Sequence, residues 1–121
     1  MKYLLILIFL ILPSITHACK QWDNVNTKLE TSYQVLHFLD YLQTSEIVEN
    51  DSYYELNPVL GKYPSQANVN QWFAMTSIAH YSISCYLPAH YRVPWQGITL
   101  VSTGLLVYHN AHIGLIFQIN F

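Results

Sequence analysis

The sequence predicts an all-α fold, a small bundle of two to three membrane-spanning helices that follows an N-terminal signal segment. Two observations favour this fold class. Of the 121 residues, 10% are charged and 52% are hydrophobic, whereas soluble domains carry about 25% charged residues. Residues 63–121 hold a single formal charge, on Arg92. The net charge of −2 and the lack of a basic cluster argue against nucleic acid as a partner.

The first 18 residues have the layout of a secretory signal peptide. Lys2 supplies a positive charge, residues 3–12 form an unbroken apolar run, and small residues precede a cleavage point after Ala18. We therefore expect a signal peptide over 1–18 and a single membrane domain over 19–121. Two alternatives stay open, namely an uncleaved anchor helix and lipid modification of the cysteine that follows Ala18.

The next segment is predicted in two parts. Residues 20–32 are polar and charged, and we expect a loop or a short amphipathic turn there. Residues 31–48 place apolar side chains at helical spacing and predict a helix. Asp40 shares one face of this helix with His37 and Thr44. Because that face is too polar to meet lipid alone, we expect it to pack against another helix.

A loop and two further helices are expected to follow. Turn signals that include Asn57-Pro58 predict a connecting loop over 49–68. Residues 69–87 and 95–117 carry no charge, and at 1.5 Å per residue each run approaches or reaches spanning length. The linker 88–94 contains two prolines. We therefore predict an antiparallel pair of spanning helices with the preceding helix packed on them.

A small outer-membrane β-barrel is the alternative fold. Apolar residues alternate with others from Ile113 to Phe121, as in a lipid-facing strand, and again over 81–87. Against this alternative, the chain left after a cut at Ala18 is barely long enough for eight strands of about ten residues. Residues 95–108 also do not alternate, so the helical fold is preferred.

Three short motifs carry a resemblance to a known pattern. They are D-x-x-Q-T at 40–44, E-x-N-P-x-L-G at 55–61 and Tyr-Pro-Ser at 63–65. This pattern resembles small uncharacterised bacterial and phage membrane proteins, and the similarity covers about residues 40–121. Together with the signal peptide it predicts a bacterial cell-envelope location, in the inner membrane or alternatively the outer membrane. The resemblance implies no activity.

Asp40 is the most informative candidate for a functional site. A carboxylate inside a bilayer costs about 2.5–3.5 kcal/mol on insertion scales, so it needs polar partners. One interpretation is an ion or proton site that Asp40 forms with His80, His109 or His112, and the last two have workable metal-ligand spacing. The preferred interpretation is a polar seam, including Thr44, that holds helices together. The identity of any metal stays open.

Other residues support no catalytic assignment. Glu55 and Asn57 are expected to fasten their loop through backbone hydrogen bonds, with a second ligand for the Asp40 site as the alternative. No nucleophile elbow or glycine-rich phosphate loop is present. We expect a small integral membrane protein with a structural or accessory role, or alternatively one that handles ions or protons. Its expected partners are the lipid bilayer and either another membrane protein or a second copy, and no cofactor is clearly indicated.

Cys19 and Cys85 are candidates for a disulfide. If 31–48 and 69–87 cross in opposite directions, both cysteines lie near the exported side, where disulfides persist. Lipid modification of Cys19 and a buried free thiol at Cys85 are the competing outcomes.

Overall fold

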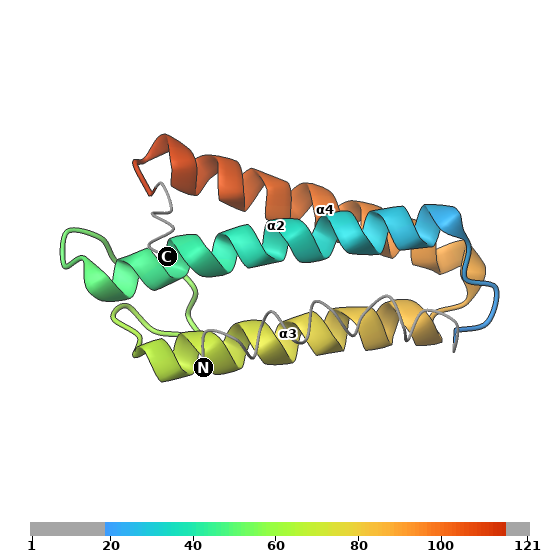
Figure 1. Ribbon diagram of the computed structural model, residues 1–121, viewed down its shortest axis with the longest axis horizontal. Helices are drawn as coiled ribbons and strands as arrows, with labels where there is room; N and C mark the ends of the chain where they lie inside the picture. The colour runs from blue at the N-terminus through green and yellow to red at the C-terminus, as the bar shows by residue number, and fades with distance from the viewer. Residues whose placement is uncertain (1–18, 116–121) are drawn as a thin grey trace, which may run out of the picture.

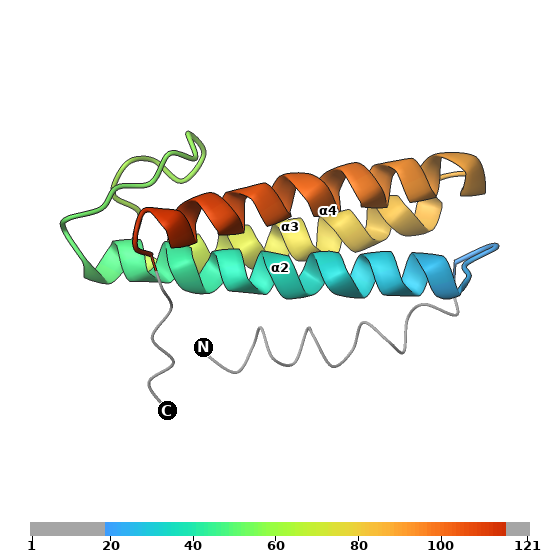
Figure 2. The same cartoon turned by 90° about the horizontal axis from the view of Figure 1, so that it is seen from above.

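The protein, seen in a computed structural model that describes residues 19–115, is a bundle of three helices: α2 (Asn24–Glu49), α3 (Gln66–Tyr86) and α4 (Ala89–His112). The helices lie side by side, with α3 running opposite to α2 and α4 (Figures 1 and 2). Between residues 19 and 115 no strand is present. The all-α prediction is therefore confirmed, and the alternating residues 81–87 belong to the end of α3.

The start of α2 differs from the prediction because its cap lies earlier in the chain. The Asp23 side chain accepts the backbone N–H of Asn26 at 2.9 Å, and the Asn26 side chain accepts the backbone N–H of Asp23 at 3.2 Å. This reciprocal pair satisfies amides that the first helical turn leaves free. The expected loop over 20–32 is therefore wrong from residue 24 onward, whereas the helix expected over 31–48 is present within α2.

The loop between α2 and α3 is held by short-range hydrogen bonds. The Glu55 carboxylate accepts the backbone N–H of Asn57 at 2.7 Å, and the Asn57 side chain in turn accepts the N–H of Val59 at 3.0 Å. Gly61 takes φ of 77°, a left-handed conformation that favours glycine. Ser65 then caps α3 by accepting the N–H of Asn68 at 3.2 Å.

Only Leu87 and Pro88 separate α3 from α4. The segment 88–94 was expected to be a linker, but α4 already begins at Ala89, directly after Pro88. Proline suits the residue before a helix because its φ angle is fixed and it has no N–H to satisfy. Pro94 lies inside α4 and costs one backbone hydrogen bond.

The predicted membrane spans are wrong, although α3 and α4 lie close to where they were expected. No helix among residues 19–115 is both long enough and apolar enough to cross a membrane. The prediction failed because an uncharged segment is not necessarily an apolar one, and both helices are rich in amides, hydroxyls and imidazoles. The transmembrane assignment is corrected accordingly, and so is the expected location in a bacterial envelope membrane, which required spanning helices. The expected signal peptide over 1–18 lies outside the described residues.

The interior of the bundle is unusually polar. A small apolar cluster forms around Tyr41, Val69 and Phe73. Elsewhere the buried side chains are mostly polar: Asn26, Glu30, Gln34, His37, Gln43, Thr44, Ser77, His80, Ser84, Arg92, Gln96 and Thr103. None of the buried side-chain nitrogen and oxygen atoms described lacks a hydrogen-bond partner. The helices are therefore joined largely by polar contacts, in contrast to the apolar interior of a typical bundle.

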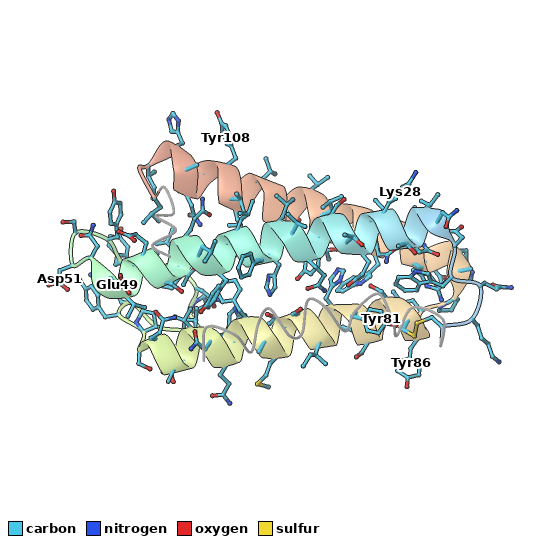
Figure 3. The ribbon with its side chains drawn as sticks, viewed as in Figure 1. Lys28, Glu49, Asp51, Tyr81, Tyr86 and Tyr108 are labelled. Atoms are coloured by element: carbon cyan, nitrogen blue, oxygen red, sulfur yellow. A yellow bond between two sulfur atoms is a disulfide. The ribbon has the colours of Figure 1, made fainter. Side chains whose placement is uncertain are left out.

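Exposed charges gather at the two ends of the bundle. Figure 3 shows Glu49 and Asp51 at the loop end and Lys28 toward the opposite end. In between, α2 carries Glu30, which is buried, and Asp40 and Glu46, which are half-buried, with Glu46 in the last turn of the helix next to the loop end. Helix α3 has no charged residue, and the single one in α4 is buried. The middle of the described bundle therefore presents a surface without exposed formal charge.

Candidate functional site

Glu30 on α2 is the centre of a buried hydrogen-bond network that joins all three helices. Its carboxylate accepts from Gln34 at 2.9 Å, from Ser84 at 3.1 Å and from Gln96 at 3.2 Å, and it lies 3.0 Å from Nδ1 of His80. The side chain of Glu30 is only 5% exposed. A carboxylate that is removed from water in this way needs such partners to remain charged.

The hydrogen bonds outweigh the effect of burial on the carboxyl group of Glu30. Burial raises the pKa of Glu30. The hydrogen bond and the charge of His80, together with the hydrogen bonds from Gln34 and Gln96, lower the pKa by a larger amount, so the pKa of Glu30 lies below its usual value. Glu30 is therefore ionised near neutral pH. The network thus contains a buried carboxylate paired with an imidazole.

Two aromatic rings fix the position of His80. Tyr33 stacks on it with ring centroids 3.5 Å apart, and Trp95 stacks on it at 5.3 Å. Its second nitrogen, Nε2, lies 2.7 Å from the hydroxyl oxygen of Thr99 on α4. The imidazole is therefore held between rings and bonded at both nitrogens, to α2 on one side and to α4 on the other.

Glu30, His80 and Thr99 are connected in the order of a catalytic triad, with a carboxylate bonded to an imidazole and the imidazole bonded to a hydroxyl. The hydroxyl oxygen of Thr99 also lies 2.8 Å from the backbone carbonyl of Trp95 and 3.1 Å from that of Gln96, so its proton has backbone acceptors besides the imidazole. These contacts link α2, α3 and α4 through a single imidazole.

Asp40 lies in a second polar cluster, nearer the loop end. Its carboxylate accepts from the side chain of Asn110 on α4 at 3.2 Å, and Asn110 also donates to Gln43 at 3.3 Å. Gln43 donates to the backbone carbonyl of Val107 at 3.1 Å. Burial, and secondarily the charge of Glu55, raises the pKa of Asp40 to about 6. The carboxyl group of Asp40 thus titrates close to neutral pH.

The residues expected to accompany Asp40 are placed elsewhere. His37 hydrogen-bonds α3 through Thr76 at 2.9 Å and the carbonyl of Phe73 at 3.2 Å, and Thr44 is buried on α2. Burial lowers the pKa of His37 to about 4, and the bond to Phe73 opposes that shift. His80 pairs with Glu30 and not with Asp40.

The histidine pair at the end of α4 is exposed. His109 and His112 both face solvent, and the ring of His112 stacks on Tyr108 at 6.1 Å. Among residues 19–115, no group of three or more His, Cys, Asp or Glu side chains is arranged to hold a metal. The spacing of His109 and His112 therefore does not correspond to a metal site within this part of the chain.

A disulfide and a set of hydrogen bonds from Arg92 close the opposite end of the bundle. Cys19 and Cys85 form a disulfide with Cα atoms 5.0 Å apart. Arg92 donates to carbonyls in the last turn of α3, at Ser84 (2.6 Å), Cys85 (3.2 Å) and Leu87 (2.9 Å), and to those of Lys20 (3.0 Å) and Gln21 (3.1 Å). The guanidinium thus satisfies free carbonyls at a helix end and ties residues 19–22 to it.

The residues that the sequence reasoning missed belong to the Glu30 network. Glu30 was placed in an expected loop, and the buried role of Gln96 was not anticipated. A usable signal was present in α4, where Gln96, Thr103 and Asn110 recur every seven residues; Gln96 and Asn110 hydrogen-bond α2, and Thr103 is buried. Polar residues that repeat with a helical period in an uncharged segment mark an inward face.

Comparison with protein-family models, with curated proteins and with solved structures finds no match to this chain. The function is therefore inferred from the geometry of the bundle alone.

Proposed function

We propose that this protein is an accessory protein that binds a helical protein partner through the outer face of α4. The observation that carries the proposal is the row of apolar side chains on that face, formed by Tyr91, Ile98, Val101, Leu105 and Tyr108, which are 58–70% exposed. We call this row, together with the exposed residues Pro94 and His112, the α4 seam. Large exposed apolar surfaces commonly mark interaction sites.

The α4 seam is distinct from the other outer faces of the bundle. Among large apolar side chains, α2 exposes Val25 and Val35. Helix α3 exposes Met75, Ile78, Ile83 and Tyr86. On α4 seven large apolar side chains are exposed, and five of them form the row, with Val93 and Leu106 beside it. Tyr108 points away from the bundle (Figure 3). A continuous apolar row is the feature by which one helix recognises another.

The buried network supports a structural role for the interior. Every buried polar side-chain atom in the described bundle has a partner, and the hydroxyl of Thr99 has two backbone carbonyls as acceptors besides the imidazole of His80. A network that is fully satisfied rigidifies a fold and specifies its packing. The interior therefore serves as a rigid support for α4, and the chemistry available to the protein is recognition by its surface.

Site-specific photo-crosslinking in the source organism tests the proposal. A benzophenone amino acid at Leu105 on the seam is expected to give one or more discrete crosslinked products. The same amino acid at Val35, which is exposed on α2, serves as the matched control and is expected to give none. Equal products from both positions, or no product from Leu105, would contradict a role for the α4 seam.

A further inference from the structure

We propose that the Cys19–Cys85 disulfide is a reducible latch, at which a dithiol attacks Sγ of Cys85 and Cys19 leaves as a thiolate that the Tyr81 hydroxyl stabilises. This role goes beyond the proposed binding function and does not depend on it. Three features of this end of the bundle support it: a hydrogen bond to one sulfur of the pair, a difference in burial between the two cysteines, and an unfavourable backbone conformation within residues 19–22.

The Tyr81 hydroxyl is bonded to one of the two sulfurs. Its oxygen lies 3.3 Å from Sγ of Cys19, and because a sulfur in a disulfide carries no hydrogen, Tyr81 is the donor. During thiol–disulfide exchange, negative charge develops on the sulfur that leaves. A hydrogen bond to a charged acceptor is stronger than one to a neutral acceptor, so this bond favours the departure of Cys19 over that of Cys85.

Tyr81 is held in place as a donor. Its side chain is buried, and the ring of Trp22 lies against it with centroids 5.7 Å apart. Burial, and secondarily the charge of Glu30, raises the pKa of Tyr81. The hydroxyl therefore keeps its proton at the mildly alkaline pH at which thiols form the thiolates that attack disulfides.

The two cysteines differ in burial. Cys19 is 8% exposed, whereas Cys85 is half-buried in the last turn of α3. An incoming thiolate must reach the sulfur that it attacks, whereas the sulfur that leaves can stay covered. Access and hydrogen bonding therefore select the same direction of exchange, with attack on Cys85 and departure of Cys19.

The exchange takes two steps and consumes one dithiol. In the first step a thiolate of the reductant forms a mixed disulfide with Cys85, and the electron pair of the broken S–S bond goes to Cys19. In the second step the other thiol of the reductant, as a thiolate, attacks its own partner sulfur, so Cys85 leaves and the reductant departs as a disulfide. The two thiol protons of the reductant end on Cys19 and Cys85, and the protein gains two electrons.

Reduction loosens residues 19–22, which we call the strap. Gln21 in the strap takes φ of 56°, a left-handed conformation that is unfavourable for a residue other than glycine. In the oxidised protein the disulfide fixes Cys19 to α3, and Arg92 donates to the carbonyls of Lys20 and Gln21. Once the S–S bond is broken, non-covalent contacts alone oppose the relaxation of Gln21.

Partial reduction of the purified, disulfide-bonded protein by glutathione, followed by quenching with N-ethylmaleimide and peptide mass spectrometry, identifies the attacked sulfur. We expect the glutathione mixed disulfide on Cys85 and the alkylated thiol on Cys19. Tyr81→Phe keeps the ring and removes the hydroxyl, so it should slow reduction by dithiothreitol about three- to tenfold and shift part of the mixed disulfide to Cys19. Tyr86→Phe, at an exposed position of the same helix, is the matched control and should behave as wild type.

The distribution of the mixed disulfide separates this role from a merely structural one, because it reports which sulfur leaves and not how stable the fold is. A mixed disulfide mainly on Cys19 of the wild-type protein, or equally on both cysteines, would overturn the proposal. A Tyr81→Phe variant that is reduced as fast as Tyr86→Phe, or faster, would do the same.

Amide hydrogen exchange of the wild-type protein tests the release of the strap. Reduction should speed exchange at residues 20–22 and leave exchange in the middle of α2 unchanged. Equal exchange at residues 20–22 in the oxidised and reduced protein would show that the disulfide is not a latch.

Discussion

Replacing Glu30 by leucine tests whether the buried network holds the bundle together. Four side chains donate to or pair with this carboxylate, but they lose different amounts when it is removed. Gln34, Ser84 and Gln96 each keep a backbone acceptor, at Ser77, His80 and Asn26 respectively. The Nδ1 atom of His80 has Glu30 as its partner. The cost of Glu30→Leu therefore falls mainly on His80.

The expected magnitude follows from this distribution of partners. A buried polar group left unsatisfied costs about 1–3 kcal/mol, and breaking a buried ionic pair costs about 3–5 kcal/mol. The added apolar side chain offsets part of the loss. We expect Glu30→Leu to lower the free energy of unfolding by about 2–4 kcal/mol, within the usual total of about 5–15 kcal/mol, so the variant still folds.

Urea denaturation followed by circular dichroism measures this loss. Glu49→Leu, in the exposed last turn of the same helix, is the matched control and should leave stability nearly unchanged. In the double variant Glu30→Leu/His80→Phe the phenyl ring keeps the stacking between Tyr33 and Trp95 without leaving an unpaired nitrogen. It should recover about 1–2 kcal/mol of the loss. The reasoning fails if Glu30→Leu is as stable as the control, or if the double variant is less stable than the single one.

Three more predictions concern other parts of the bundle. Replacing Cys19 and Cys85 together by alanine should lower the free energy of unfolding by about 2–4 kcal/mol, because the disulfide links residues 66 positions apart and restricts the unfolded chain. Identical denaturation midpoints of the wild-type protein with and without reductant would contradict this stabilisation. Arg92→Lys should lower the free energy of unfolding by about 2 kcal/mol, since an ammonium group cannot reach both the carbonyls at the end of α3 and those of residues 20–21. It should also speed amide hydrogen exchange at residues 20–22, and unchanged exchange would show that Arg92 does not hold this segment. Asp40→Asn should stabilise the protein at pH 7 by on the order of 2 kcal/mol. The pKa of Asp40 is raised to about 6 in the folded protein. Between about pH 4 and pH 6 the folded protein therefore holds a proton that the unfolded chain releases. The contribution of Asp40 to stability falls as the pH rises through this range. The difference in stability between wild type and Asp40→Asn should therefore vanish near pH 4, and a difference that does not change with pH would exclude the assigned titration.

The sequence was sufficient to locate the helices but not to identify their surroundings. The runs 69–87 and 95–117 correspond to α3 and α4 because a long segment without charge or strong turn signals is typically regular. The same runs were assigned to a bilayer because charge was used as the measure of polarity. Amide and hydroxyl side chains carry no charge, yet they dominate the inward faces, and only their spacing along the helix reveals that they point inward.

The candidate site was predictable only in kind. Asp40 was correctly recognised as a carboxylate in need of polar partners, but its partner Asn110 lies 70 positions away and is brought near only by the parallel packing of α2 and α4. Glu30 was missed because the polar stretch around it suggested a loop. The capping pair of Asp23 and Asn26 was the local signal that a helix begins earlier, and it would have placed Glu30 on the same helix.

The distribution of polarity within the bundle links its stability to its proposed role. Polar contacts between α2 and its neighbours occur at separate levels along the axis, around Glu30, His37 and Asp40. Sliding α4 by one turn would separate Asn110 from Asp40 and Gln96 from Glu30 at the same time, so these levels fix the register of the helices more strictly than apolar packing would. Because the inward positions of α4 are used for this purpose, most of its large apolar residues are exposed. Their burial then contributes nothing to the isolated bundle and becomes available to association, which is why we expect substitutions in the α4 seam to change partner binding without lowering the stability of the fold.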